Sequence, residues 1–331
     1  MPLLTPPQTG LSGPLLMVPF ILQLAAIALM PFLAHHWWER HYPKVSVVLG
    51  STTVFYYLLV LHAGNRLLEA LHEYASFIIL LASLFIAAGG IHISVKGEAT
   101  PRRNLLFLVI GAILANLIGT TGASMLLIRP WIRMNRYRIT GFHTVFFIFL
   151  ISNVGGALTP IGDPPLFLGF LKGVPFWWTL EHLWRPWLLV VGLLGVIFYL
   201  IDRKNFLRAP RPVRDKETSK EKWGIKGLVN LLPLGAILLG VFLPSPWREI
   251  VMTGAAVLSW CITPRQIHEM NDFSLAPIRE VAWLFLGIFA TMIPALDYLE
   301  HHATALASSF GMGALHFYYF TGILSSVLDN A

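Results

Sequence analysis

Long apolar runs, separated by short polar segments, follow one another along all 331 residues of the chain. An α-helix rises about 1.5 Å per residue, so about 20 apolar residues are needed to cross the 30 Å apolar layer of a bilayer. We therefore expect an all-α, polytopic membrane protein. The pattern predicts membrane segments at residues 14–34, 45–62, 75–95, 105–128, 142–171, 183–201, 227–243, 249–263, 280–299 and 313–331.

The composition supports this class. Charged residues make up 12% of the chain and hydrophobic residues 56%, whereas soluble domains have about 25% and 45–50%. The mean hydropathy is +0.66. No Lys or Arg precedes Pro14, so the chain lacks the basic start of a cleavable signal peptide, and the first apolar run is expected to stay as a span. The single cysteine, Cys261, excludes an internal disulfide framework.

The apolar run 142–171 is interrupted by Ser152-Asn153-Val154-Gly155-Gly156-Ala157-Leu158-Thr159-Pro160-Ile161-Gly162-Asp163-Pro164-Pro165. Proline removes a backbone donor and glycine favours irregular torsions, so a continuous helix is not expected here. Non-helical backbone at membrane depth persists only where it is buried in protein or lines a wet cavity. Broken helices of this kind hold ions or substrates in many secondary transporters. The segment is therefore predicted to form half of a transport site.

The segment 105–128 contains the small polar stretch Gly119-Thr120-Thr121-Gly122-Ala123-Ser124 and has arginines on both sides. Basic residues at both ends predict a re-entrant hairpin that enters and leaves on the cytoplasmic side, with the small residues at its tip. With this topology, 20 of the 24 Lys and Arg lie in cytoplasmic segments. A full crossing would instead place the basic loop 202–226 outside.

That loop carries nine basic and four acidic residues, and the net charge of the chain is +7. A nucleic-acid partner could be proposed from these values alone. We interpret the loop instead as a solvated cytoplasmic linker, and we expect no nucleic-acid partner.

The two sides of the linker look related. Spans 45–62 and 75–95 match 249–263 and 280–299, and the hairpin 105–128 matches 313–331. We predict a first repeat at residues 1–201, a linker at 202–226 and a second repeat, inverted in the membrane, at 227–331. Its counterparts of 142–171 and 183–201, about 80 residues, are absent, so we expect the chain to continue in the full protein.

Three acidic residues, Asp163, Asp329 and Asp297, fall within predicted spans, and no Lys or Arg lies in the middle of a span. An unpaired carboxylate costs several kcal/mol at that depth, so we expect these acids to bind a proton or a metal cation. Na⁺ prefers hard oxygen ligands. Candidate ligands besides Asp163 and Asp329 are Ser152, Asn153, Thr159, Thr120, Thr121, Ser325, Asn330 and backbone oxygens around Gly155 and Gly156.

Each of these residues also has a structural interpretation. Asp163 suits the N-cap of a half-helix that begins at Pro164. Asp329 could be a solvated acid near the end of the sequence, and Asp297 a water-facing residue at the end of a span. Asn116 and Ser124 are typical of hydrogen bonds between membrane helices. All of these alternatives stay open at the level of sequence.

No enzymatic motif is present. The His35-His36-Trp37-Trp38, Phe176-Trp177-Trp178 and His301-His302 clusters fall at span ends, where aromatic rings lie at the level of the lipid headgroups. Adjacent histidines rarely converge on one metal ion. The chain has no phosphate loop, zinc signature or nucleophile triad pattern. We therefore expect neither an enzyme nor a resident cofactor.

The stretch Ser152 to Asp163 resembles the broken-helix motif of the ion transporter superfamily, and Gly119 to Ile128 is similar to its first re-entrant hairpin. The closer likeness is to NhaD-type sodium/proton antiporters and their citrate-transporter relatives, whose G-G-x-x-[ST]-P-I-G-D pattern reads here Gly155 to Asp163. Their later S-S-x-x-D-N matches Ser325 to Asn330. The Pro164-Pro165 pair is instead a feature of the dicarboxylate/sodium symporter branch.

The resemblance implies a secondary transporter of the bacterial inner membrane, with a homodimer expected on that basis alone. The first hypothesis is a Na⁺(Li⁺)/H⁺ antiporter that exchanges ions at Asp163 and Asp329. The alternative is a Na⁺-coupled carrier for citrate or another anion. Two like charges 4 Å apart repel by about 4 kcal/mol at an effective dielectric constant of 20, and an anion beside Asp163 has no intramembrane Lys or Arg to offset that repulsion.

Overall fold

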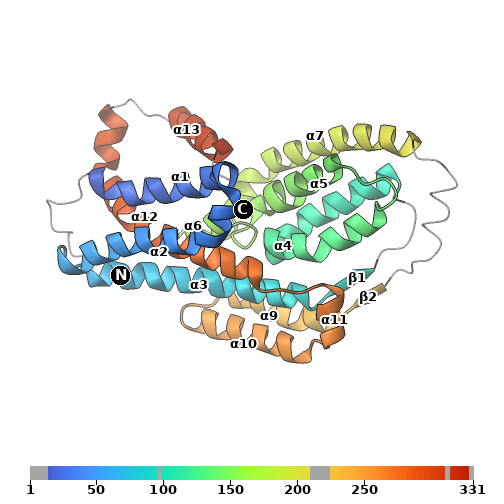
Figure 1. Ribbon diagram of the computed structural model, residues 1–331, viewed down its shortest axis with the longest axis horizontal. Helices are drawn as coiled ribbons and strands as arrows, with labels where there is room; N and C mark the ends of the chain where they lie inside the picture. Colours follow the sequence, from blue (N-terminus) through green and yellow to red (C-terminus); the bar gives the residue numbers. More distant parts are fainter. Residues whose placement is uncertain (1–13, 95–98, 209–223, 310–313, 328–331) are drawn as a thin grey trace. The chain divides into compact units, whose positions relative to one another are not determined.

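The computed structural model describes residues 14–94, 99–208, 224–309 and 314–327 (Figure 1). Among these residues, six helices are long and apolar enough to cross a membrane, which confirms the prediction of an all-α, polytopic membrane protein. They lie at Leu15–Leu33, Gly64–Gly89, Pro101–Met134, Gly141–Leu158, Trp178–Arg208 and Ala276–Tyr298.

The chain divides into two compact units, and two long helices contribute to both. Of the described residues, the first unit contains 14–75, 279–309 and 314–327, and the second contains 76–94, 99–208 and 224–278. The inverted repeat predicted from the sequence stays a prediction. Asp329 and Asn330 lie outside the described residues.

The first unit is helical in its described part. It contains a 3-10 turn at Pro14–Met17, α1 (Val18–Leu33), α2 (His35–Leu59), the start of α3 (Gly64–Gly89), most of α12 (Ala276–Ser309), and α13 (Ala314–Val327). Residues 35–44, which lie between two predicted membrane segments, form the first turns of α2. The apolar run that begins at residue 45 marks only the part of α2 that is suited to lipid. The helix itself begins ten residues earlier, at polar positions.

In this unit α2 packs closely on α12. A Cβ added to Gly287 would lie 2.8 Å from the Cβ of Ser46, which shows that the two backbones approach at small residues. Buried Gln23 of α1 donates a hydrogen bond of 2.9 Å to Ser46. This bond joins α1 to α2 within the unit.

The expectation that the intramembrane acids lack fixed partners is wrong for Asp297. The Arg66 guanidinium pairs with its carboxylate, and the Tyr57 hydroxyl donates to its Oδ2 at 2.8 Å. Arg66 lies near the start of α3, about 230 residues away in sequence, so the charge pattern along the chain gave no sign of the pair. The pair neutralises Asp297 and leaves this acid with a structural role.

The second unit contains the rest of α3, the hairpin, the broken helix and the helices that follow them. Its elements are β1 (His92–Ser94), α4 (Pro101–Met134), α5 (Gly141–Phe147), the π-helical turn η2 (Ile148–Asn153), the 3-10 turn η3 (Val154–Leu158), α6 (Pro164–Leu171), α7 (Trp178–Arg208), β2 (Gly224–Lys226), the 3-10 turn η4 (Leu228–Asn230), α9 (Leu231–Gly240), α10 (Trp247–Ile262) and α11 (Arg265–Met270). β1 and β2 pair antiparallel, with Ile93 opposite Ile225.

The helix α4 folds back on itself at Gly119, which has φ 76° and ψ 154° inside an otherwise helical run. Its first arm (residues 101–118) lies against its second arm (residues 120–134), as Figure 1 shows. Asn104 donates to Asn135 at 2.7 Å, and the rings of Phe107 and Trp131 stack with centroids 5.6 Å apart. The fold-back predicted for 105–128 is therefore present. Which side of a membrane its two ends face stays a prediction.

A buried ionic cluster holds the open end of this hairpin. Asp202 of α7, whose side chain is fully buried, pairs with Arg138 and accepts hydrogen bonds from Asn104 (2.9 Å) and His143 (3.1 Å). Because the His143 Nδ1 atom faces the Thr140 backbone N–H at 3.2 Å, we assign its proton to Nε2, which donates to Asp202. Arg138 and Asp202 were both expected in solvated segments, and that expectation is wrong.

The Asp202 cluster yields a stability prediction. Replacing Arg138 by Met leaves a buried carboxylate without its counter-charge, which typically costs about 3–5 kcal/mol. We expect a clearly lower Tm for Arg138→Met in detergent, and a smaller loss for the double variant Arg138→Met/Asp202→Leu, which removes both charges. Arg136→Met, at an exposed position, is the matched control and should leave the Tm unchanged. Equal losses for the single and double variants would contradict the pairing.

Candidate functional site

The predicted broken helix is present between Gly141 and Leu171. It begins as α5, continues through the π-helical η2 and the 3-10 turn η3, unwinds at residues 159–163 and resumes as α6. π-helical and 3-10 stretches inside a helix often mark functional sites. Pro164 and Pro165 occupy the first turn of α6, where a proline lacks no hydrogen bond that the helix would make.

Two glycines make the unwound turn compact. Gly156 and Gly162 touch each other so closely that a Cβ on either would overlap the backbone of the other. Gly155 is similarly confined, because an added Cβ would lie 2.7 Å from the Leu150 oxygen and 3.0 Å from Ala112 Cα. Gly155 and Gly156 were proposed from the sequence as part of the site. In the structure they allow the chain to turn beside the hairpin.

The tip of the hairpin contacts this turn directly. The Thr120 backbone N–H donates to the Gly162 oxygen at 3.1 Å. Asn116 accepts from the Leu158 N–H at 2.8 Å through its side-chain oxygen, and its backbone oxygen accepts from the Thr159 hydroxyl at 2.6 Å. These bonds fix the end of the first arm of α4 against the end of η3. Asn116 thus has the helix-linking role that its structural interpretation predicted.

The helix α7 supplies donors for oxygens that the break leaves without helical partners. The Trp187 indole N–H donates to the Val154 oxygen at 2.9 Å and to the Gly155 oxygen at 3.2 Å. The Thr179 hydroxyl donates to the Leu158 oxygen at 2.8 Å. Sequence reasoning missed both residues. Trp187 carried a usable signal, since a tryptophan inside an apolar run needs an acceptor for its N–H group, whereas Thr179 carried none.

These bonds narrow the set of possible cation ligands. The sequence analysis counted the freed backbone oxygens of the break as available, but those of Val154, Gly155, Leu158 and Gly162 already accept hydrogen bonds. A carbonyl oxygen has two lone pairs and can still accept a second contact. The turn also carries one charged side chain, a carboxylate.

That carboxylate belongs to Asp163, which stands at the N-cap of α6 with φ −140° and ψ 135°. Its backbone oxygen accepts from the Leu166 and Phe167 N–H groups, but its side chain makes no capping hydrogen bond. The side chain is half-buried, and within the described residues no hydrogen bond or ion pair reaches its carboxylate. Asp163 therefore occupies the N-cap position, as its structural interpretation predicted. Its carboxylate oxygens, however, do not accept the hydrogen bonds that a capping side chain accepts.

The other predicted site residues divide into three groups. Thr159, Thr120, Thr121 and Ser152 lie at or near the contact of hairpin and break, with Ser152 Oγ 2.8 Å from Ser124 Oγ. Asn153 is exposed at the end of η2. Ser325 lies in α13, where its side chain is not among those described, and Asp329 and Asn330 lie beyond the described residues. Their roles stay predictions.

Four helix ends meet at this contact. The first arm of α4 and the helical run 141–158 present carbonyl ends, which carry partial negative charge. The second arm of α4 and α6 present amide ends, which carry partial positive charge. The carbonyl ends favour cations, and the amide ends favour anions. The Asp163 carboxylate lies at the amide end of α6, which carries partial positive charge. The arrangement can therefore hold a cation next to an acid, with amides of the second arm close by.

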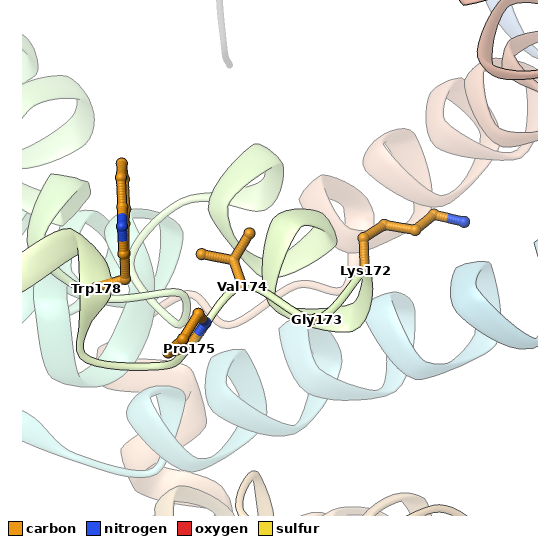
Figure 2. Close-up of a pocket in the computed structure, with 5 residues that line it drawn as sticks. All are labelled: Lys172, Gly173, Val174, Pro175 and Trp178. Atoms are coloured by element: carbon orange, nitrogen blue, oxygen red, sulfur yellow. The ribbon is translucent and has the colours of Figure 1, made fainter. Parts of the chain in front are cut away.

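A surface pocket lies at the far end of α6, with a volume of about 390 Å³. Its lining residues, drawn in Figure 2, are Lys172, Gly173, Val174, Pro175 and Trp178. Val174 and Trp178 rise on one side of the turn, and Lys172 extends away from them. All five are exposed, and none was predicted as a site residue. Because α6 has eight residues, about 12 Å of helix separates this pocket from Asp163.

Comparison with known proteins places the chain in a family. A family model described as "Putative citrate transport" matches residues 10–331. The chain belongs to this family. It is 26% identical, over 249 residues, to a 46 kDa membrane protein of Mycobacterium leprae, an alignment that covers 71% of the chain and 58% of that protein.

Two proteins of Mycobacterium tuberculosis named as uncharacterized transporters are 28% identical over 210 residues, which cover 61% of the chain and 48% of each protein. The chain thus spans about half the length of the curated relatives it matches. No solved structure matches it.

The fold-back of α4 yields the second prediction. At φ 76° and ψ 154°, Gly119 has a conformation that residues with a Cβ avoid, and an added Cβ would lie 3.3 Å from the Ile161 oxygen of the break. We expect Gly119→Ala to lower the Tm, with a cost of about 1–3 kcal/mol.

Gly122→Ala is the matched control. It lies on the same hairpin, and its added Cβ would meet Ala88 at an ordinary 3.5 Å. A Gly119→Ala variant as stable as Gly122→Ala in the same thermal unfolding experiment would contradict the fold-back at Gly119.

Proposed function

We propose that the full-length protein is a secondary active transporter whose cation site includes Asp163, and that it exchanges Na⁺ or Li⁺ for protons across the bacterial inner membrane. The observation that carries the proposal is the half-buried Asp163 carboxylate, which no described hydrogen bond or ion pair reaches, in a broken helix. The transporter names of the relatives and the apolar helices support the general class.

In this proposal the carboxylate binds either a proton or Na⁺, and this competition couples the two ions. A proton neutralises the acid in a site of low dielectric constant, and Na⁺ does so with oxygen ligands. The Thr159 hydroxyl donates a hydrogen bond to the Asn116 backbone oxygen, which leaves the lone pairs of that hydroxyl for a cation. Ser152, Asn153, Thr120, Thr121 and, beyond the described residues, Ser325, Asp329 and Asn330 are the further ligands that we propose.

Two other acids of the chain have arginine partners, and this contrast supports the choice of Asp163. Asp297 has Arg66 and Tyr57 as partners, and Asp202 has Arg138. Those acids are neutralised by the protein itself, whereas Asp163 is not, within the part of the chain that the structure describes. A carboxylate without a counter-charge from the protein is suited to bind a transported cation.

A second candidate function is Na⁺-coupled carriage of citrate or a related anion, and the family description favours it. The amide end of the second arm of α4 lies beside the break and is suited to a carboxylate. One Na⁺ on Asp163 would cancel the repulsion between this acid and an anionic substrate, and a second bound Na⁺ would turn it into attraction. Both candidates share the same cation ligand.

The transport test uses everted membrane vesicles with a fluorescent reporter of the proton gradient. Adding NaCl or LiCl to vesicles with wild-type protein should collapse the gradient, and Asp163→Asn should lose at least nine-tenths of that response. Glu181→Gln, an exposed acid at the start of α7, is the matched control and should respond like wild type. KCl should have no effect on any of them.

The same vesicles separate the two candidates. No response to the chloride salts, together with uptake of labelled citrate that requires a Na⁺ gradient, would overturn the antiporter and favour the anion carrier. Citrate uptake that Asp163→Asn abolishes would keep the cation site. Full activity of Asp163→Asn in both assays would overturn the proposed site as a whole.

A further inference from the structure

Seven basic residues surround the end of the second unit where the buried Asp202 cluster lies. Asn104, at the start of α4, donates hydrogen bonds both to Asn135, just past the end of α4, and to Asp202, near the end of α7. These bonds bring the three chain segments together. The basic residues that flank them are all exposed, and we call them the basic end: Arg102, Arg103, Arg133, Arg136, Arg203, Lys204 and Arg208.

Acidic residues are rare in the described segments that carry the basic end. Within residues 99–104, 129–138 and 202–208 the only acidic residue is Asp202. Its side chain is fully buried, and it is paired with Arg138, which does not belong to the basic end. The exposed charges of these three segments are therefore all positive. Such a surface attracts anions, and the attraction weakens with salt.

Exposed apolar side chains lie next to these charges. Leu106 is 59% exposed and lies one helical turn after Arg102, and Leu207 is 74% exposed and lies one turn after Arg203. Ile132 and Ile139 are also exposed, at 44% and 38%, on either side of Arg133 and Arg136. Cations beside apolar groups, at the ends of apolar helices, fit a ligand with an anionic head and an apolar tail.

We propose that the basic end binds the headgroup of an anionic phospholipid in the cytoplasmic leaflet, with its first acyl carbons against Leu106 and Leu207. Basic clusters at the cytoplasmic ends of membrane helices are known to attract such lipids. A soluble phosphate or carboxylate would use the positive charge but not the apolar neighbours. Charge and apolar exposure together therefore favour a lipid over a soluble anion.

Lipid at this place would act on the elements that form the candidate site. Arg102 and Arg133 lie on the two arms of the hairpin, and Arg203 lies on α7, whose Trp187 and Thr179 donate to the break. A headgroup that bridges these cations would hold the arms and α7 together from outside, as the Asp202 cluster does from inside. We therefore expect bound lipid to raise the thermal stability of the protein.

The test measures binding of phosphatidylglycerol to the purified full-length protein in detergent, by native mass spectrometry and by the shift in Tm. The variant Arg133→Gln/Arg136→Gln/Arg203→Gln/Lys204→Gln removes four charges of the basic end. A matched control removes four exposed charges elsewhere: Arg40→Gln/Lys44→Gln/Arg265→Gln/Arg279→Gln. Neither variant changes a residue of the Asp202 cluster or of the candidate site, and the readout does not depend on transport.

We expect phosphatidylglycerol to bind wild type and the control, to raise their Tm by several degrees, and to bind the basic-end variant at least tenfold more weakly. Phosphatidylcholine should give no shift in any of them. If both variants lost lipid binding equally, the lipid would be attracted by the net positive charge of the protein and not by a site at the basic end, and the proposal would be overturned. A stabilisation by inorganic phosphate as large as that by the lipid would overturn it in favour of a soluble anion.

Discussion

A broken helix in a membrane exposes backbone N–H and C=O groups that water cannot satisfy, and the structure of the second unit follows from how this chain satisfies them. Asn116 and the Thr120 N–H reach the break from the hairpin, and Trp187 and Thr179 reach it from α7. Each unmet bond would cost several kcal/mol in lipid. The hairpin, the break and α7 therefore depend on one another, and the position of Asp163 depends on all three.

The cost of burying polar groups also explains which charged side chains have a partner in the fold and which do not. Asp202 and Asp297 each meet an arginine that is remote in sequence, so the protein offsets the cost of burying them. Asp163 stands among helix ends whose hydrogen bonds are largely made, without a counter-charge among the described residues. An acid that is tolerated in this state is suited to a mobile counter-charge, and this is the physical basis of the proposed cation exchange.

Local features were predictable from the sequence because their causes are local. Three glycines and three prolines between 152 and 165 predicted the break, and the small residues at 119–124, flanked by arginines, predicted the fold-back of α4. Pairings between distant segments were not predictable. Arg138 looked like one cation among many in a basic loop, and nothing in the chain linked it to Asp202, 64 residues away. Arg66 and Asp297 were hidden for the same reason.

The most direct test of the central claim is Na⁺ binding to the purified full-length protein, measured by isothermal titration calorimetry without citrate. The account predicts a saturable heat for NaCl and LiCl, weaker apparent binding at lower pH because protons compete for the same carboxylate, and no binding to Asp163→Asn. A folded Asp163→Asn protein that binds Na⁺ as tightly as wild type, with the same pH dependence, would contradict the account. The cation would then be held elsewhere in the chain.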